Sequence, residues 1–244
     1  MRPLLIITGG IGFLTWDDVI QHRHHFKKYR LQTKIVLFTT AILLILPAIF
    51  FFFAEYSDEP LKERMLHSSF QSVTTRTAGF NTADFSVMSE PSAMLMTVLM
   101  LIGGCSGSTA GGMKTSTVAV LYLSALSVYR RKNDVECFKR RIPTDTIHTA
   151  GAILFMYISL FLSTGIAVSI IESLPITSCL FETGSALGTA GLTLGITTSL
   201  SLSSHIILMI LMFAGRVGGL TLIYAAFASN NDISRLPQEK VAVG

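Results

Sequence analysis

Four long runs of this chain contain no Asp, Glu, Lys or Arg, and they limit its fold more than any other feature: 35–54, 91–113, 146–171 and 183–215. A helix that crosses a bilayer needs about 20 mostly apolar residues, so every run is long enough. Half of the 244 residues are hydrophobic and only 14% are charged, which excludes an ordinary soluble domain. The sequence therefore predicts an all-α integral membrane protein.

The charged residues predict how the chain is oriented. Lys and Arg concentrate in two connections, 17–34 and 129–145, whereas acidic residues predominate in 55–92 and 172–204. Positively charged connections stay on the cytoplasmic side of a membrane. We therefore expect a multi-pass protein of the cell inner or plasma membrane, with both basic connections and the 230–244 tail in the cytoplasm. The basic residues indicate this topology and imply no nucleic-acid partner.

A short loop occurs twice, as TTRTAGF at 74–80 and as ALGTAGL at 186–192. Each copy follows a helix that opens at a proline, predicted over 60–74 and 175–187, and both helices are too short to span. Lipid cannot satisfy the backbone of such a loop, which must be enclosed by protein or line a water-filled cavity. We predict two re-entrant pore loops; the alternative is two unrelated loops that share the letters TAG.

These features together predict two repeats of helix, re-entrant pore loop and helix. The first covers 35–128, the second covers 146–229, and the connection 129–145 joins them. The first comprises helix 35–54, pore helix 60–74, filter 75–79 and broken helix 91–128. The second comprises helix 146–171, pore helix 175–187, filter 188–191 and helix 203–229. Residues 1–16 are expected to be the remnant of an earlier repeat's second helix; a signal peptide is the alternative, but no small-residue cleavage site follows.

The two loops carry the chemistry that a dehydrated cation requires. Backbone carbonyls of an extended loop replace the water of an ion, and glycine permits positive φ values and close approach. The predicted filter residues, which would hold a cation through their carbonyls alone, are Thr75, Arg76, Thr77, Ala78, Gly79, Leu187, Gly188, Thr189, Ala190 and Gly191. The alternative is that Gly79 and Gly191 only make tight turns. We expect the Arg76 side chain to point backward into the protein, toward Glu182.

Five glycines interrupt the apolar sequence between residues 103 and 115. Each interior glycine costs a helix about 0.5 to 1 kcal/mol relative to alanine, so we predict a break in mid-membrane that acts as a movable constriction. Its residues are Gly103, Gly104, Ser106, Gly107, Ser108, Thr109, Gly111, Gly112 and Lys114. A nucleotide-binding P-loop is the alternative, but that motif has Lys directly after its second glycine, where this chain has Met113. Lys114 either takes part in the break or reaches the cytoplasmic side.

Arg216 lies inside the apolar segment 203–229. A charge at the bilayer centre costs about 2.5 to 3.5 kcal/mol unless it finds partners, and no acidic residue lies on this segment or on 91–128. We expect carbonyls of the glycine-rich break to accept its hydrogen bonds. Our hypothesis is that Arg216 latches the break and repels cations until it moves; the alternative is a snorkelling or helix-packing arginine.

The cysteines and histidines predict no metal centre. Cys105, Cys137 and Cys179 have no paired spacing. The histidine cluster 22–25 either binds a metal or, as we favour, belongs to a solvated basic connection at the lipid headgroups. A membrane-bound enzyme that uses ATP would need a nucleotide-binding domain, for which this sequence has no room. We therefore predict no enzyme activity and no cofactor.

Four motifs resemble the membrane subunits of bacterial potassium uptake systems, the Trk, Ktr and HKT superfamily, and especially the Ktr type. These motifs are SVTTRTAGFNT at 72–82, IGGCSGSTAGGMKTS at 102–116, SALGTAGLTLGIT at 185–197 and FAGRVGGLTL at 213–222. The resemblance implies a pseudo-four-fold pore like that of potassium channels, built from four such repeats. It also implies that Gly79 and Gly191 are the third and fourth filter glycines, that 103–114 is an intramembrane gating loop, and that Arg216 contacts it.

The resemblance further implies channel-like uptake of potassium, or alternatively sodium. It implies partners as well: a homodimer of the complete protein and a cytosolic, nucleotide-binding regulatory subunit, which would contact the basic connections and the tail. Only two of the four expected filter loops are present. We therefore expect a truncated or split C-terminal half that needs the missing N-terminal half to close a pore; the alternative is a non-conducting fragment. The preference for potassium over sodium depends, in this superfamily, on the first repeat's filter residue, which is absent from this sequence.

Overall fold

The computed structural model describes residues 2–23, 25–81, 85, 88–132 and 134–219, and the regular secondary structure over these residues is almost all helical. The elements are α1 (Arg2–Ile11), α2 (Phe13–His22), η1 (Phe26–Lys28), α3 (Leu31–Ala54), α4 (Leu61–Thr74), α5 (Glu90–Leu101), α6 (Thr115–Tyr129), β1 (Glu136–Cys137), β2 (Arg140–Arg141), α7 (Thr144–Glu172), α8 (Ile176–Leu187), η3 (Thr197–Ser199) and α9 (Leu202–Val217). The predicted helix segment 220–229 and the tail 230–244 lie outside the described residues.

Two helices, α3 and α7, are each long and apolar enough to cross a membrane. A third candidate is the pair α1 and α2, which bends by 91° at Gly12. Large apolar side chains stand exposed on the long helices, among them Phe38 at 62% and Phe155 at 75%. Such surfaces are stable against lipid and unstable against water.

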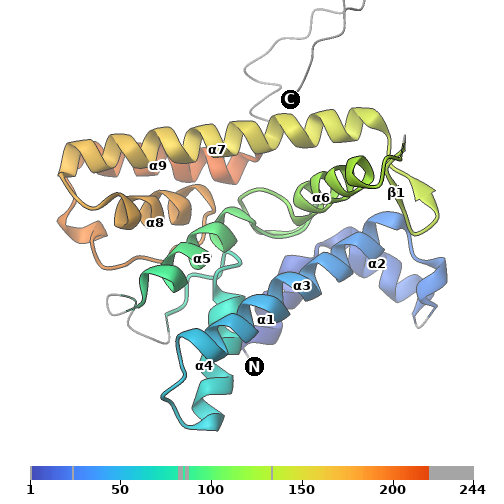
Figure 1. The fold of residues 1–244 in the computed structure, drawn as a ribbon, viewed down its shortest axis with the longest axis horizontal. Helices are drawn as coiled ribbons and strands as arrows, with labels where there is room; N and C mark the ends of the chain where they lie inside the picture. The colour runs from blue at the N-terminus through green and yellow to red at the C-terminus, as the bar shows by residue number, and fades with distance from the viewer. Residues whose placement is uncertain (1, 24, 82–84, 86–87, 133, 220–244) are drawn as a thin grey trace, which may run out of the picture.

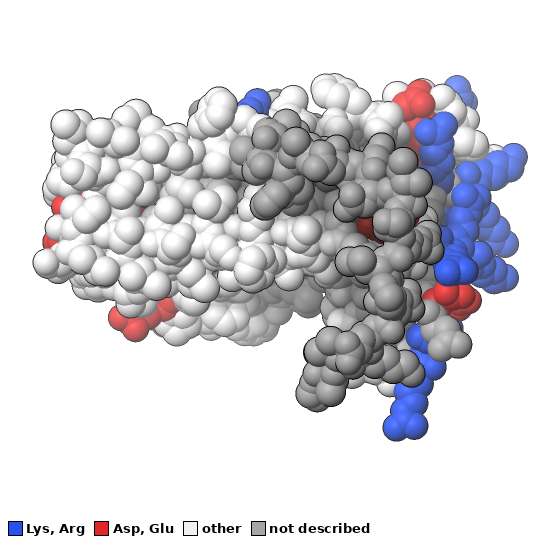
Figure 2. Space-filling model, turned by 90° about the horizontal axis from the view of Figure 1, so that it is seen from above, with Lys and Arg blue, Asp and Glu red and all other residues white. Residues whose placement is uncertain are grey.

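Charge is distributed along the molecule as the sequence predicts. Figure 2 shows Lys and Arg gathered at one end of the molecule, next to a broad uncharged surface. Both spanning helices follow this polarity, because α3 begins after Arg30 and is followed by Glu55, while α7 begins shortly after Arg141 and ends at Glu172. The positively charged residues of both connections therefore lie at the same end of the molecule, as the predicted topology requires.

The two repeats lie side by side with the same order of elements (Figure 1). In the first, α4 packs on α3; in the second, α8 packs on α7. The repeats meet where α5 packs on α8 and α6 packs on α7. A core formed by Phe51, Met96, Met100 and Phe181 fills the space between α3, α5 and α8. The short helix α8 is therefore enclosed by protein, whereas α4 is buried at its C-terminal end and exposes Met65 and Leu66 nearer its start.

The broken second helix of the first repeat is two helices, α5 and α6, joined by the glycine-rich loop 102–114. The break falls inside the predicted range 91–128, at the five glycines. The predicted long span is therefore present as two short apolar helices, neither of which crosses a membrane alone.

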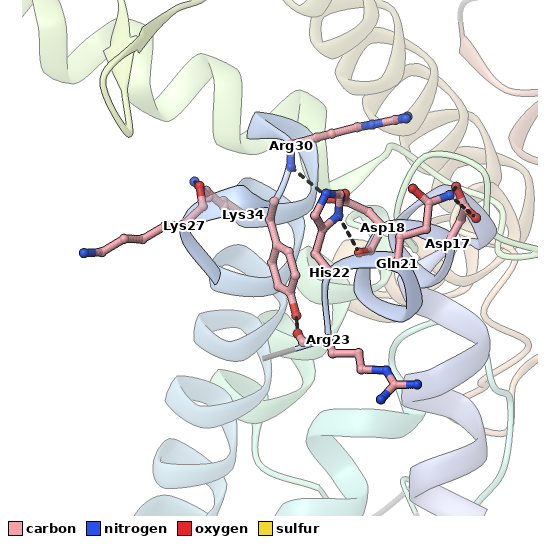
Figure 3. A network of polar contacts seen from close by, with 9 residues as sticks. Asp17, Asp18, Gln21, His22, Arg23, Lys27, Arg30 and Lys34 are labelled. Atoms are coloured by element: carbon pink, nitrogen blue, oxygen red, sulfur yellow. Dashed lines mark hydrogen bonds and ion pairs between the residues drawn. The ribbon is translucent and has the colours of Figure 1, made fainter. Parts of the chain in front are cut away.

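The first connection is shorter than the range 17–34, because α2 continues to His22. Several of its polar residues pair within the helix and at the junction with α3 (Figure 3). The Gln21 amide donates to both Asp17 oxygens at 2.9 Å, and the Asp18 carboxylate accepts the Arg30 amide at 2.8 Å. Asp18 also pairs with His22 Nδ1 at 3.0 Å. These contacts stabilise the charged C-terminal part of α2, whose first two residues are apolar.

The second connection contains a small antiparallel hairpin of β1 and β2, which the sequence did not predict. Its turn residues Phe138 and Lys139 have φ values of 48° and 61°. Two-residue hairpin turns of type I′ need positive φ at both positions, and Asn or Gly usually marks them. Phe and Lys give no such signal. Buried Val135 and Ile142 flank the hairpin and anchor it to Ile35 and Val120.

Candidate functional site

The two predicted filter loops have the same backbone conformation. Thr77 and Thr189 adopt φ values of 58° and 53°, and the glycines two positions later, Gly79 and Gly191, adopt 70° and 80°. A threonine with positive φ is an outlier that the surrounding structure must hold in place. The same unusual pair of angles at aligned positions argues that the loops are copies of one device rather than unrelated turns.

The loops also lie next to each other. A Cβ added at Gly79 would lie 2.8 Å from the Ala190 carbonyl oxygen and 3.6 Å from the Gly191 Cα. Real Cβ atoms do not approach a carbonyl oxygen so closely, so the backbones can meet only because residue 79 is glycine. Glycine there does more than make a turn. It brings the carbonyls of the two loops to one place.

A hydroxyl from the end of each short helix anchors the residue that follows the filter glycine. Thr74 Oγ1 accepts the Phe80 amide at 3.2 Å and donates to the Phe80 carbonyl at 2.6 Å. In the second repeat, Ser185 Oγ accepts the Leu192 amide at 2.8 Å. Both hydroxyl residues are buried. The sequence analysis missed them, although a Ser or Thr in the last turn before each loop was the available signal.

The predicted pairing of Arg76 with Glu182 is wrong. The Glu182 carboxylate accepts the Thr193 and Thr197 hydroxyls at 2.6 and 2.7 Å and the Leu194 amide at 3.1 Å. Its lone pairs are therefore satisfied by the segment that follows its own filter loop. The pairing was predicted from charge balance alone. In the structure, Glu182 instead forms hydrogen bonds with residues close to it in the sequence.

Arg76 does point backward into the protein, but toward the glycine-rich loop. Its side chain is only 7% exposed, and its Nη2 lies 4.0 Å from the Cys105 thiol sulfur. Cys105 Sγ also accepts the Thr115 hydroxyl at 3.1 Å. Within the described residues the Arg76 Nε has no hydrogen-bond partner. The first filter loop thus carries a buried positive charge that contacts the broken helix through a neutral group.

The loop 102–114 is closed at its neck by main-chain hydrogen bonds. The Gly103 amide donates to the Met113 carbonyl at 2.9 Å, and the Met113 amide donates to Leu101 at 3.1 Å. A Cβ at Gly103 would lie 1.9 Å from the Gly111 carbonyl oxygen. The glycines are therefore required for close backbone packing. The break is a compact, ordered loop.

This loop packs directly beneath the second filter loop. A Cβ at Gly111 would lie 2.2 Å from Thr189 Oγ1, and one at Gly112 would lie 3.2 Å from the Gly188 carbonyl oxygen. Thr189 Oγ1 is buried and has no hydrogen-bond partner among the described residues. The predicted gating residues and the predicted filter residues of the second repeat therefore form one contact.

Carbonyls near the ends of two other helices, α1 and α9, hold the loop from either side. The Cys105 amide donates to the Gly10 carbonyl at 2.9 Å, and the Gly112 amide donates to the Gly215 carbonyl at 3.1 Å. The glycines that follow these two helices, Gly12 and Gly218, have nearly identical angles, with φ of 91° and 89° and ψ of 145° and 144°. The two helix ends that contact the loop therefore share one backbone conformation.

Two cations bind carbonyls at the tip of the loop. Arg216 Nη1 donates to the Thr109 carbonyl at 2.5 Å, which confirms the predicted type of acceptor. Lys114 Nζ donates to the Ala110 carbonyl at 2.7 Å, so Lys114 takes part in the break. Both bonds fix the loop in its packed position. The role of Arg216 as a gate latch stays a prediction.

The histidine cluster gives no sign of a metal site. His22 pairs with Asp18, the His25 amide donates to the His22 carbonyl at 3.0 Å, and His24 lies outside the described residues. Over the part of the chain that the structure describes, no group of three or more His, Cys, Asp or Glu side chains is arranged to hold a metal ion.

Comparison with known proteins identifies relatives of the whole chain. A family model described as TrkH, cation transport protein, matches residues 2–235. The chain is 36% identical to the potassium/sodium uptake protein NtpJ of Enterococcus hirae, with 98% of this chain and 56% of that protein covered. It is also 36% identical to the Ktr system potassium uptake protein B of Bacillus subtilis, over 98% of this chain and 55% of that protein.

A similar fold is known from the crystal structure of the potassium transporter TrkH from Vibrio parahaemolyticus. The TM-score is 0.75 at 19% identity, with 93% of this chain and 51% of that chain covered. At that identity the match supports the fold alone. The chain spans about half the length of the curated relatives it matches.

Proposed function

Because this chain belongs to the TrkH family of cation transport proteins, we propose that it supplies two of the four filter loops of a potassium-conducting path. The observation that carries the proposal is the meeting of the loops at Gly79 and Ala190, which brings two sets of carbonyls together. Potassium is the proposed ion, with sodium as the alternative, because one relative is named for both.

The proposed mechanism is passive and needs no covalent chemistry. An ion sheds water against the carbonyls of 75–79 and 187–191, which supply oxygen ligands without full charge. Beneath the second loop, 102–114 closes the path while its neck and tip bonds are intact. The membrane potential drives the ion inward, at about 2.3 kcal/mol per unit charge for each 100 mV.

The remaining two loops would correspond to the part of the relatives that this chain does not cover. A homodimer and a cytosolic, nucleotide-binding regulatory subunit are the further partners that we propose, and their contact would fall on the basic connections. The second candidate is a non-conducting fragment. The observation behind this candidate is that the chain covers 56% of the length of the NtpJ relative.

Complementation of a bacterium deficient in potassium uptake separates these candidates. We expect no growth at low potassium with this chain alone, and growth when it is co-expressed with the N-terminal half of the Enterococcus hirae relative. A Gly151→Ala variant is the matched control, because a Cβ there meets no atom within 4 Å. Growth with the chain alone would contradict the requirement for a second half. Lack of growth with both halves present in the membrane would favour the fragment.

The latch is tested in the same co-expressed system. Replacing Arg216 by Gln removes the charge that binds the Thr109 carbonyl and the positive field that faces an entering cation. We expect rubidium influx to rise, because the loop tip loses a charge-assisted hydrogen bond, about 1.5 to 3 kcal/mol in typical cases. Unchanged influx at equal expression would rule out the latch and leave Arg216 as a packing residue.

A further inference from the structure

A cavity of ≈ 620 Å³ lies between α3, α6 and α7. Its walls include Ile35, Val120, Ala150 and Ile153, and most of its surface is apolar. On α3, Phe38 lies about one turn after the lining residue Ile35 and is exposed. The apolar lining therefore continues onto the exposed surface of α3.

The inner end of the cavity reaches the loop 102–114. Ser106 of that loop and Ser116 of α6 both line the cavity, and their hydroxyls hydrogen-bond to each other at 2.8 Å. One hydroxyl donates to the other, so each makes one hydrogen bond within the protein at this end of the cavity. Ser106 also meets the break between α1 and α2, since a Cβ at Gly12 would lie 2.6 Å from its carbonyl oxygen.

The outer end of the cavity lies at the basic end of the molecule. Leu31, Ile142 and Asp145 line it there. Exposed Arg30 and Arg141 directly precede two of these residues, and the Lys and Arg cluster of Figure 2 occupies the same end. Arg141 pairs with Asp134 at 3.0 Å, whereas Arg30 forms no ion pair within the described residues. Apart from Asp145, the charge beside this opening suits an anionic headgroup.

We infer that this cavity binds an acyl chain of an anionic phospholipid from the cytoplasmic leaflet. The chain enters between α3 and α7, the phosphate lies beside the basic residues, and the chain end contacts the Ser106–Ser116 pair. A lipid in this position touches the loop that closes the proposed ion path, so the site links the membrane to that loop. Binding itself does not depend on transport by this polypeptide.

Photo-crosslinking of this chain in its host membrane tests the site. The probe is phosphatidylglycerol with a diazirine near the end of one acyl chain, and mass spectrometry locates the modified peptides. We expect crosslinks on α6 and α7 at the cavity residues Val120, Ala150 and Ile153. Ala150→Trp, which fills the cavity, should abolish them. Gly151→Trp is the matched control and should retain them, because residue 151 faces open space on the same helix.

Ala150→Leu provides a smaller obstruction should the tryptophan variant fail to fold, and it should reduce the same crosslinks. A zwitterionic probe, phosphatidylcholine with the same acyl diazirine, should label the cavity less than the anionic probe. Three results would overturn the inference: no cavity crosslinks in the wild-type chain, equal loss in Gly151→Trp, or crosslinks from α6 and α7 to a second protein chain in place of lipid.

Discussion

The two filter loops share a backbone but differ in what lies behind them. Position 76 of the first loop is a buried arginine, and the aligned position of the second loop is Gly188, where a Cβ would lie 2.1 Å from the Met100 carbonyl oxygen. The first loop therefore has room behind it for the largest cationic side chain. The second has no room for a methyl group, because the end of α5 and the loop 102–114 press against it.

The two loops therefore differ in how they contact the broken helix. The second loop is the surface against which the broken helix closes, since Gly111 and Gly112 both contact it. The first loop reaches the broken helix through the long side chain of Arg76, at Cys105. A change at the second loop should therefore disturb folding and the gate, whereas a change at position 76 should mainly alter electrostatics.

The largest effect is expected for Gly188→Ala. The added methyl group meets main-chain atoms of Met100 that cannot rotate away, and overpacking of this kind costs typically about 1 to 3 kcal/mol or more. We expect a large fall in the yield of folded protein and in the midpoint of thermal unfolding in detergent. Gly151→Ala is the control. An unchanged midpoint in Gly188→Ala would remove the steric distinction between the loops.

Next in size is the contrast between Gly79→Ala and Gly191→Ala. Both residues have positive φ, which costs an alanine about 1 to 2 kcal/mol. Only Gly79 adds a clash, because its Cβ would lie 2.8 Å from the Ala190 oxygen, whereas the nearest atom to a Cβ at 191 is 3.6 Å away. Thermal unfolding should rank Gly79→Ala as the less stable variant. The reverse order would contradict the observed approach of the loops.

A smaller effect is expected when the anchoring hydroxyls are removed. Thr74→Val leaves both the amide and the carbonyl of Phe80 without their partner, while Ser185→Ala affects only the Leu192 amide. An unsatisfied buried group costs about 1 to 3 kcal/mol. The Leu192 amide is buried, whereas Phe80 is half exposed and water can replace its lost partner, so Ser185→Ala should lower the unfolding midpoint more. Ser163→Ala, at an exposed hydroxyl, is the control and should have no effect.

The smallest effect on stability is expected for Arg76→Met. The side chain is buried without a carboxylate partner among the described residues, so an apolar replacement of similar length removes a desolvated charge and fills its space. The unfolding midpoint should stay equal or rise. Rubidium uptake in the co-expressed transporter should show a lower KM, because one positive charge behind the filter is gone. A midpoint as low as that of Gly188→Ala would show that Arg76 is a structural residue.

Some contacts could be predicted from the sequence because the side chain involved has few possible partners. Arg216 had to use carbonyls, since its own segment and the broken helix contain no acidic residue, and Thr109 accepts its hydrogen bond. Arg76 had no such constraint. Several acidic and polar groups competed, and Glu182 was already satisfied by Thr193, Leu194 and Thr197.

Four features could be predicted from the sequence: an integral membrane protein, two loops that follow short helices, a broken helix, and basic residues gathered at one end of the molecule. Each of these follows from composition and order along the chain, because lipid tolerates so few backbone and charge arrangements. Three features were visible only in the tertiary structure. They are the atoms that lie against Gly188, the contact between Arg76 and Cys105, and the cavity between α3, α6 and α7 beside Ser106. Those outcomes depend on how helices distant in sequence pack, and short-range pattern carries no record of that packing.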